Sequence, residues 1–305
     1  MIKNLSLKAY GKINLGLDVL KKREDGYHEV RMIMQTVGIF DRIDLLWQPT
    51  PGIQVETNLY YLPNNENNLV YKAAKLLMDE YSIADGLLIR LKKFIPVAAG
   101  MAGGSSDAAA VLFGVNAMFR LGLTTRELME RGVRIGADVP YCILRGTALS
   151  EGIGEILTPL PPVPQCKVLI AKPGISVSTR SVYESLHANS LKPEAHPDID
   201  GMIGAIRSRS LYGIAERLGN VLETVTVPNY PVIQAIKEKM MEYGAIGALM
   251  SGSGPTIFGL FNNPGAAEYA YEELRFGSAS DLSKQVYLTN FYNPKENSHG
   301  ARAEG

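Results

Sequence analysis

The chain has 305 residues, more than one hydrophobic core usually fills, so its length predicts two domains of roughly 150 residues each. Hydrophobic residues make up 46% of it, and 31 Lys and Arg balance 31 Asp and Glu, which disfavours a general nucleic-acid or membrane-surface binder. Cys142 and Cys166 lie far apart with no histidine at ligand spacing, so neither a disulfide framework nor a zinc site is expected. No apolar run of about 18 residues is present, and a reducing cytoplasm is the expected compartment.

The N-terminal quarter is predicted to be rich in β-strands. Residues 7–20 alternate between apolar and polar positions, so Lys12 and Asn14 are expected on the same face of a strand. Asp25 and Gly26 form a turn signal after this strand. Further strands are expected at 31–39, 41–47 and 52–57.

The next segment favours helices around one buried strand. Asn68 is a predicted helix N-cap, because apolar residues follow it at helical spacing. Helices are expected at 69–81, at 107–121 and from 124 or 125 to 136, with a buried strand at 86–94.

A glycine-rich stretch, "FIPVAAGMAGGSSDAAAVLF" (94–113), joins that strand to a helix. Glycines allow backbone N–H groups to approach a ligand closely, and a helix N-terminus carries about half a positive charge. The spacing therefore favours an anion-binding loop over a purely structural turn. It is not a Walker A sequence, because no lysine precedes Ser105, and it matches neither the dinucleotide-binding pattern nor a nucleophile elbow.

The second half begins after the densest proline cluster, residues 159–165, which predicts a domain boundary. Strands are expected at 166–172, 246–251, 256–261 and 285–291, and helices at 231–243 and 264–275. With several inserted helices set aside, this order is βαββαβ and predicts a ferredoxin-like domain. The polar tail from Asn293 onward is expected to be frayed.

Three smaller features allow both a structural and a functional interpretation. The segment Ser251–Gly254 fits an ordinary hairpin turn, or a second loop that helps to hold a nucleotide between two domains. Asp138 fits an N-cap before Pro140, or a carboxylate that takes a proton from a substrate hydroxyl. Lys12 fits a surface lysine, or a charge that balances Asp138 during transfer.

Four segments together resemble the GHMP small-molecule kinases, named for galactokinase, homoserine kinase, mevalonate kinase and phosphomevalonate kinase. "PVAAGMAGGSSDAA" is similar to the family's phosphate loop, "SGSGPTIF" to its C-terminal glycine motif, "GADVPYCI" to its catalytic aspartate segment and "AYGKINLGLDV" to the strand with its active-site lysine. The resemblance implies an α+β fold with a ribosomal protein S5 domain 2-like N-terminal domain, 1–160, and a ferredoxin-like C-terminal domain, 161–305.

Within the family, "KINLGL", "DGYHEV" and "GGSSDAA" are similar to the members that act on a cytidine diphosphate derivative of methylerythritol. This resemblance implies ATP-dependent phosphorylation of the 2-hydroxyl of the methylerythritol unit, in the non-mevalonate isoprenoid pathway. Another GHMP kinase with a different alcohol acceptor is the alternative. An RNA-binding module and a nucleotide-binding protein without catalysis are less favoured, the first because the charge is balanced.

The resemblance also implies roles for single residues, beginning with Lys12 and Asp138 as the catalytic pair. The ATP phosphate loop would consist of Pro96, Val97, Ala98, Ala99, Gly100, Met101, Ala102, Gly103, Gly104, Ser105 and Ser106, supported by Ser251, Gly252, Ser253 and Gly254. The substrate residues would be Asn14 for the erythritol unit, Tyr27 and His28 for the cytidine end, Tyr183 stacked on cytosine and Thr179 nearby. Tyr183 fits a helix core residue equally well. Mg²⁺ is expected with ATP, its ligands unassigned, and the protein is expected to be a monomer or weak homodimer.

Two features of the loop depart from the family pattern or raise a question. Ala98, Ala99 and Ala102 stand where relatives often have glycine, so fewer positions are expected to adopt positive φ. Asp107 beside a phosphate would be repulsive unless a cation intervenes or the side chain points away.

Overall fold

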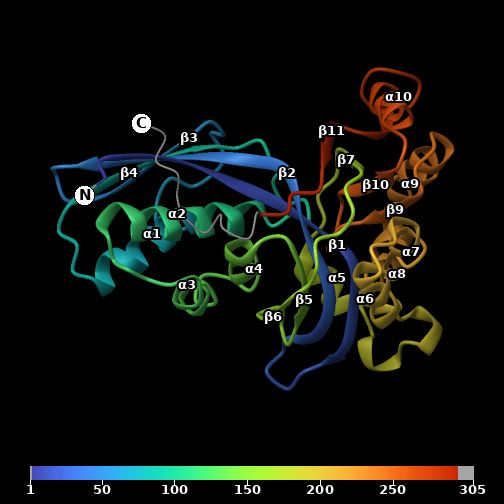
Figure 1. Cartoon of the computed structure of the whole chain (residues 1–305), viewed down its shortest axis with the longest axis horizontal. Coiled ribbons are helices and arrows are strands. Elements are labelled where there is room, and N and C mark those ends of the chain that lie inside the picture. Colours follow the sequence, from blue (N-terminus) through green and yellow to red (C-terminus); the bar gives the residue numbers. More distant parts are fainter. Residues whose placement is uncertain (1, 295–305) are drawn as a thin grey trace.

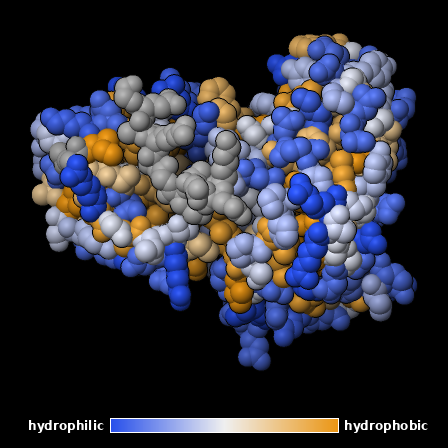
Figure 2. Space-filling view, in the orientation of Figure 1, coloured by the Kyte–Doolittle hydropathy of each residue, from blue (hydrophilic) through white to orange (hydrophobic). Residues whose placement is uncertain are grey.

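The computed structural model of the chain describes residues 2–294, so most of the predicted polar tail, 295–305, lies outside the described residues. The structure contains a seven-stranded and a four-stranded β-sheet, which occupy different halves of the molecule (Figure 1). Hydrophilic residues cover most of the face in Figure 2, with hydrophobic ones in small groups, as is usual for a water-exposed surface. In residues 2–294 no helix is both long and apolar enough to cross a membrane.

The seven-stranded sheet is built around one long antiparallel pair. Its strands are β1 (Asn4–Lys22), β2 (His28–Gln48), β3 (Gly52–Thr57), β4 (Gly86–Lys92), β5 (Thr147–Glu151), β6 (Ile156–Pro159) and β8 (Gly219–Asn220). The sequence predicted two strands where β2 is continuous, because β2 pairs with β1 between His28 and Leu46. The pairing of β1 shifts register on both sides of the segment from Lys12 to Asn14. Such irregularities bend a strand and re-aim its side chains.

Four helices belong to this half: α1 (Leu69–Glu80), α2 (Gly103–Phe119), α3 (Thr125–Gly132) and α4 (Val139–Leu144). The Asn68 cap follows the sequence prediction, since Asn68 accepts a hydrogen bond from the backbone N–H of Val70. Helix α3 begins at Thr125, one of the two predicted starts, and Thr124 forms a capping box with Glu127. Helix α2 begins four residues before the predicted Asp107. Most of its residues are buried, because β1, β2, α1 and α4 all pack against it.

The four-stranded sheet has the order β11-β7-β10-β9 and is antiparallel throughout. Its elements are β7 (Lys167–Lys172), α9 (Val232–Glu242), β9 (Gly247–Met250), β10 (Ile257–Phe261), α10 (Pro264–Arg275) and β11 (Gln285–Asn290). This arrangement confirms the predicted ferredoxin-like βαββαβ order. Between β7 and α9 the chain inserts α5 (Thr179–Ser185), α6 (Ile199–Arg207), α7 (Leu211–Ala215) and α8 (Glu223–Asn229).

The two sheets are joined by shared packing and by backbone pairing. One hydrophobic cluster contains Ile13 and Leu15 of β1 together with Ile170 of β7 and Phe258 of β10. A β-bridge joins Val37 of β2 to Phe291, the residue after β11, and β8, from the later half of the chain, pairs in parallel with β1 within the seven-stranded sheet. The proline-rich connection after β6 leads into the second sheet, and a domain boundary at residue 160 stays a prediction.

Candidate active site

A cavity of about 1200 Å³ lies between the two halves of the molecule and collects most of the predicted site residues. The predicted residues that line it are Lys12, Tyr27, His28, Pro96, Val97, Ala98, Ala99, Gly100, Ala102, Gly103, Gly104, Ser105, Asp138, Thr179, Tyr183, Gly252, Ser253 and Gly254. Asn14, Met101, Ser106 and Ser251 do not line it. Segments that are far apart in sequence therefore line one cavity, and the roles that the resemblance implies for them stay predictions.

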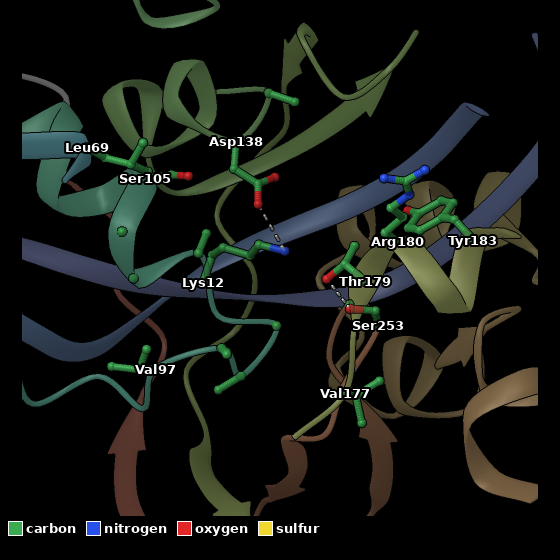
Figure 3. Close-up of a pocket in the computed structure, with 18 of the residues that line it drawn as sticks. Lys12, Leu69, Val97, Ser105, Asp138, Val177, Thr179, Arg180, Tyr183 and Ser253 are labelled. Carbon is green, nitrogen blue, oxygen red and sulfur yellow. Dashed lines mark hydrogen bonds and ion pairs between the residues drawn. The ribbon is translucent and has the colours of Figure 1, made fainter. Parts of the chain in front are cut away.

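Lys12 and Asp138 face each other across the middle of the cavity (Figure 3). The Lys12 Nζ lies 4.0 Å from Asp138 Oδ2, and the Lys12 side chain is only 6% exposed, against 35% for Asp138. Asp138 occupies the N-cap position of α4, but its side chain makes no capping hydrogen bond. Its carboxylate is thus free to accept a proton or a hydrogen bond from a ligand in the cavity.

Asn14 contacts Lys12 and is not among the residues that line the cavity. Both side chains lie on the same face of β1, as predicted, and Lys12 Nζ donates a hydrogen bond to Asn14 Oδ1 at 2.7 Å. Asn14 is fully buried. The contact that the structure gives it is therefore with the lysine, and its expected contact with an erythritol unit stays a prediction.

The phosphate loop, residues 96–106, leads from the end of β4 into α2. Ala98, Gly100 and Ala102 have φ values of +50°, +70° and +53°. The expectation that alanines would reduce the number of positive-φ positions is wrong here, because Ala98 and Ala102 adopt this conformation despite their Cβ atoms. Such backbone strain costs about 1–3 kcal/mol per residue and persists only where the surroundings hold it.

The two serines of the phosphate loop have different surroundings. Ser105 lines the cavity at the start of α2. Ser106 is buried and donates a hydrogen bond to the backbone carbonyl of Tyr10. The Met101 carbonyl in turn accepts a hydrogen bond from the Lys12 N–H at 3.1 Å. Ser106 and Met101 therefore attach the loop to β1, while Ser105 presents its hydroxyl to the cavity.

The second glycine loop, residues 251–254, contacts the phosphate loop directly. Ser251 Oγ donates a hydrogen bond to the Gly100 carbonyl at 3.0 Å. A Cβ on Gly100 would lie 2.1 Å from the Ser251 carbonyl oxygen, so the two backbones meet without room for a side chain. Next to them, Ser253 and Thr179 share a hydrogen bond of 2.7 Å between their hydroxyls (Figure 3).

Aromatic residues line the end of the cavity opposite the phosphate loop. The rings of His28 and Tyr183 are tilted against each other with centroids 5.2 Å apart, whereas Tyr27 is 59% exposed. Burial, together with the charge of Lys22, lowers the pKa of His28, which keeps the imidazole neutral near pH 7. Its Nε2 is buried and has no hydrogen-bond partner within residues 2–294. Burial raises the pKa of Tyr183, so its hydroxyl stays protonated.

Several cavity residues had no recognisable signal in the sequence. Examples are Leu62, Pro63, Asn67 and Asn68, which lie between β3 and α1, and Leu69, the first residue of α1; they line the end of the cavity near the phosphate loop. The sequence here indicates only a loop and a helix cap. Lys93 also lines the cavity, although the sequence predicted only a strand residue at this position.

The donors in the cavity are compatible with Mg²⁺ bound mainly through phosphates. Within residues 2–294 no group of three or more His, Cys, Asp or Glu side chains is arranged to hold a metal ion. Mg²⁺ in phosphate-transferring sites usually needs only one or two protein ligands and keeps several waters. Ser105 and Asp138 both line the cavity and offer oxygen donors of this kind.

Comparison with known proteins agrees with this geometry. Residues 68–146 match the GHMP kinases N terminal domain and residues 202–278 match the GHMP kinases C terminal model. The 4-diphosphocytidyl-2-C-methyl-D-erythritol kinase of Lachnoclostridium phytofermentans is 55% identical over 291 residues, which cover 95% of this chain and 98% of the relative. The kinase of the same name from Lachnospira eligens is 55% identical over 96% of this chain and 100% of its own.

A solved structure of a kinase from the same family is similar to this chain in its fold. A crystal structure of 4-(cytidine 5'-diphospho)-2C-methyl-D-erythritol kinase superimposes with a TM-score of 0.78 at 31% identity, covering 95% of this chain and all of the other. The fold and site thus define a GHMP kinase, which confirms the resemblance. Within that class, the chain belongs to the family of the 4-diphosphocytidyl-2-C-methyl-D-erythritol kinases.

The contact between the two loops gives a direct test of how the cavity is held together. We expect Gly100→Ala to destabilise the protein by about 2 kcal/mol or more beyond Gly122→Ala, because only Gly100 meets another backbone. Gly122 is a matched control, since its φ of +75° carries a similar conformational penalty and its Cβ would meet open space. Urea unfolding of both variants measures the difference. Equal destabilisation would contradict the importance of the contact.

Proposed function

We propose that this protein transfers the γ-phosphoryl group of ATP to the 2-hydroxyl of 4-diphosphocytidyl-2-C-methyl-D-erythritol, a step of the non-mevalonate isoprenoid pathway. The observation that carries this proposal is the position of the Lys12–Asp138 pair. The pair lines the same cavity as a glycine-rich loop at a helix N-terminus and an aromatic end containing His28 and Tyr183. Family membership supports both the reaction and the substrate.

The transfer requires little covalent chemistry from the protein. Phosphoryl transfer has a loose transition state, so catalysis depends mainly on position and charge. As the bond from the acceptor oxygen to the γ-phosphorus forms, the bond from that phosphorus to the β–γ bridging oxygen breaks and ADP leaves. Asp138 orients the hydroxyl and receives its proton. Lys12, held by Asn14, compensates the negative charge that spreads over the transferred group.

Nucleotide phosphates would bind at the phosphate loop. Backbone N–H groups near Gly103 and Gly104 lie at the start of α2, where the helix dipole favours an anion. Mg²⁺, when bound, would neutralise charge on the nucleotide phosphates, and Ser105 is the residue of the phosphate loop that would hold it. The second glycine loop supports the phosphate loop through Ser251.

The aromatic end would bind the cytidine moiety. The unpartnered Nε2 of neutral His28 can form a hydrogen bond with a base edge, and Tyr183 and the exposed Tyr27 offer ring faces for stacking. Lys22 and Arg180 line this end as well and can attract a diphosphate. These features favour a cytidine diphosphate derivative over a small uncharged alcohol.

Replacing the proposed base tests the catalytic assignment. Asp138→Asn should lower kcat by about two to four orders of magnitude, the range for loss of a general base, while the protein remains folded. ADP release with the cytidine substrate measures kcat, and Asp79→Asn is the control because Asp79 is 64% exposed on α1. A folded Asp138→Asn enzyme with near-normal turnover would refute the assignment.

Lys12 requires a separate measurement, because its ammonium could bind the nucleotide instead of stabilising the transition state. We expect Lys12→Ala to reduce kcat more strongly than it weakens ATP binding, since its ammonium is closest to Asp138 and Asn14. Steady-state kinetics and equilibrium binding of ATP separate the two effects. An unchanged kcat with lost ATP affinity would assign Lys12 to the nucleotide site.

The acceptor can be tested at the aromatic end. His28→Ala should raise the KM for the cytidine substrate by about 5- to 150-fold, the effect of losing one buried hydrogen bond, and leave the KM for ATP within about twofold. His187→Ala is the control because His187 is exposed and does not line the cavity. If His28→Ala leaves the KM for the acceptor unchanged, another alcohol becomes the better candidate.

A further inference from the structure

A buried cluster of three charged groups lies behind the phosphate loop. The Lys93 ammonium donates hydrogen bonds to a carboxylate oxygen of Asp41 on β2 and, at 2.6 Å, to Asp107 Oδ2 on α2. The three side chains are 4%, 0% and 3% exposed. This arrangement answers the question that the sequence raised about Asp107, because the cation beside it is a lysine of the same chain.

The cluster connects the three elements that determine the course of the phosphate loop. Asp41 Oδ1 accepts hydrogen bonds from the backbone N–H groups of Phe94 and Ile95, the second at 2.8 Å. Asp41 thus fixes the chain at the point where it leaves β4. Asp107 stands in the second turn of α2, where the loop ends. Lys93 donates hydrogen bonds to both carboxylates, so the two ends of the loop are linked through its ammonium.

The lysine occupies an electrostatically unusual position. A Cβ on Gly103 would lie 3.1 Å from Lys93 Nζ, so the ammonium lies directly beside the first residue of α2. The helix dipole disfavours a cation at this end. Asp41 and Asp107 offset that unfavourable interaction, and an anion bound on the cavity side of the loop would interact favourably with the ammonium. Lys93 is in fact among the residues that line the cavity.

We propose that Lys93 is a nucleotide-positioning residue, whose ammonium is fixed by Asp41 and Asp107 as a positive charge behind the phosphate loop. The loop lacks the lysine that Walker A sequences use for phosphates, and Lys93, the residue directly after β4, supplies a cation instead. The inference deepens the proposed function and rests on ATP being bound at this loop. It identifies the polyphosphate, and not the adenine or the acceptor, as the ligand group on which Lys93 acts.

Calorimetric binding of ADP and of adenosine tests the inference. Lys93→Met should weaken ADP binding by about 10- to 100-fold and leave adenosine binding within about twofold, because only ADP carries charges for the ammonium to attract. Lys93→Arg should restore much of the ADP affinity. Lys92→Met, which removes an exposed neighbouring lysine, should behave as the unmodified protein. A Lys93→Met protein that binds ADP normally, or loses both ligands equally, would overturn the proposal.

A second variant keeps the proposal testable if Lys93→Met does not fold. The double variant Lys93→Met/Asp107→Asn removes one of the carboxylates that the methionine leaves unpaired, and the same selective loss of ADP is expected. Normal ADP binding by the folded double variant would contradict the proposal. Failure of the unmodified protein to bind ADP would refute the proposed function itself.

Discussion

The close approach of two backbones, at Gly100 and Ser251, is the constraint on which the rest of the site depends. These residues are 151 positions apart, yet the serine hydroxyl binds the glycine carbonyl and no side chain fits between them. One loop leads into α2, the other joins two strands of the ferredoxin-like sheet. Their contact therefore determines how the two halves of the protein face each other, and with it the width of the cavity between them.

The remaining chemistry is arranged around this contact through buried polar interactions. Asn14 accepts a hydrogen bond from the Lys12 ammonium. Ser106 donates a hydrogen bond to the Tyr10 carbonyl and so attaches the phosphate loop to β1. Lys93 joins the loop to β2 and α2. Leaving a buried polar or charged group without its partner costs free energy, so these hydrogen bonds and ion pairs hold their groups in a narrow range of positions. That rigidity suits a reaction in which position and charge account for most of the catalysis.

The strained alanines of the phosphate loop follow from the same rigidity. Ala98 and Ala102 adopt positive φ, a conformation that is unfavourable for alanine because of its Cβ atom. The strain is maintained because both ends of the loop are fixed, one by Asp41 and the other by α2. Backbone strain of this kind is concentrated at functional sites. In this protein it shapes the surface that would contact phosphate.

The sequence by itself determined the order of elements in the second domain, the cap of α1, the family and about half of the residues that line the cavity. Those features depend on local periodicity, capping and short segments whose residue types are chemically distinctive. Only the tertiary structure decided that Asn14 binds Lys12, that Ser106 faces β1 and that Lys93 pairs with Asp41 and Asp107. Strand register and helix packing bring these partners together from distant positions, and neither is encoded in the spacing of residues along the chain.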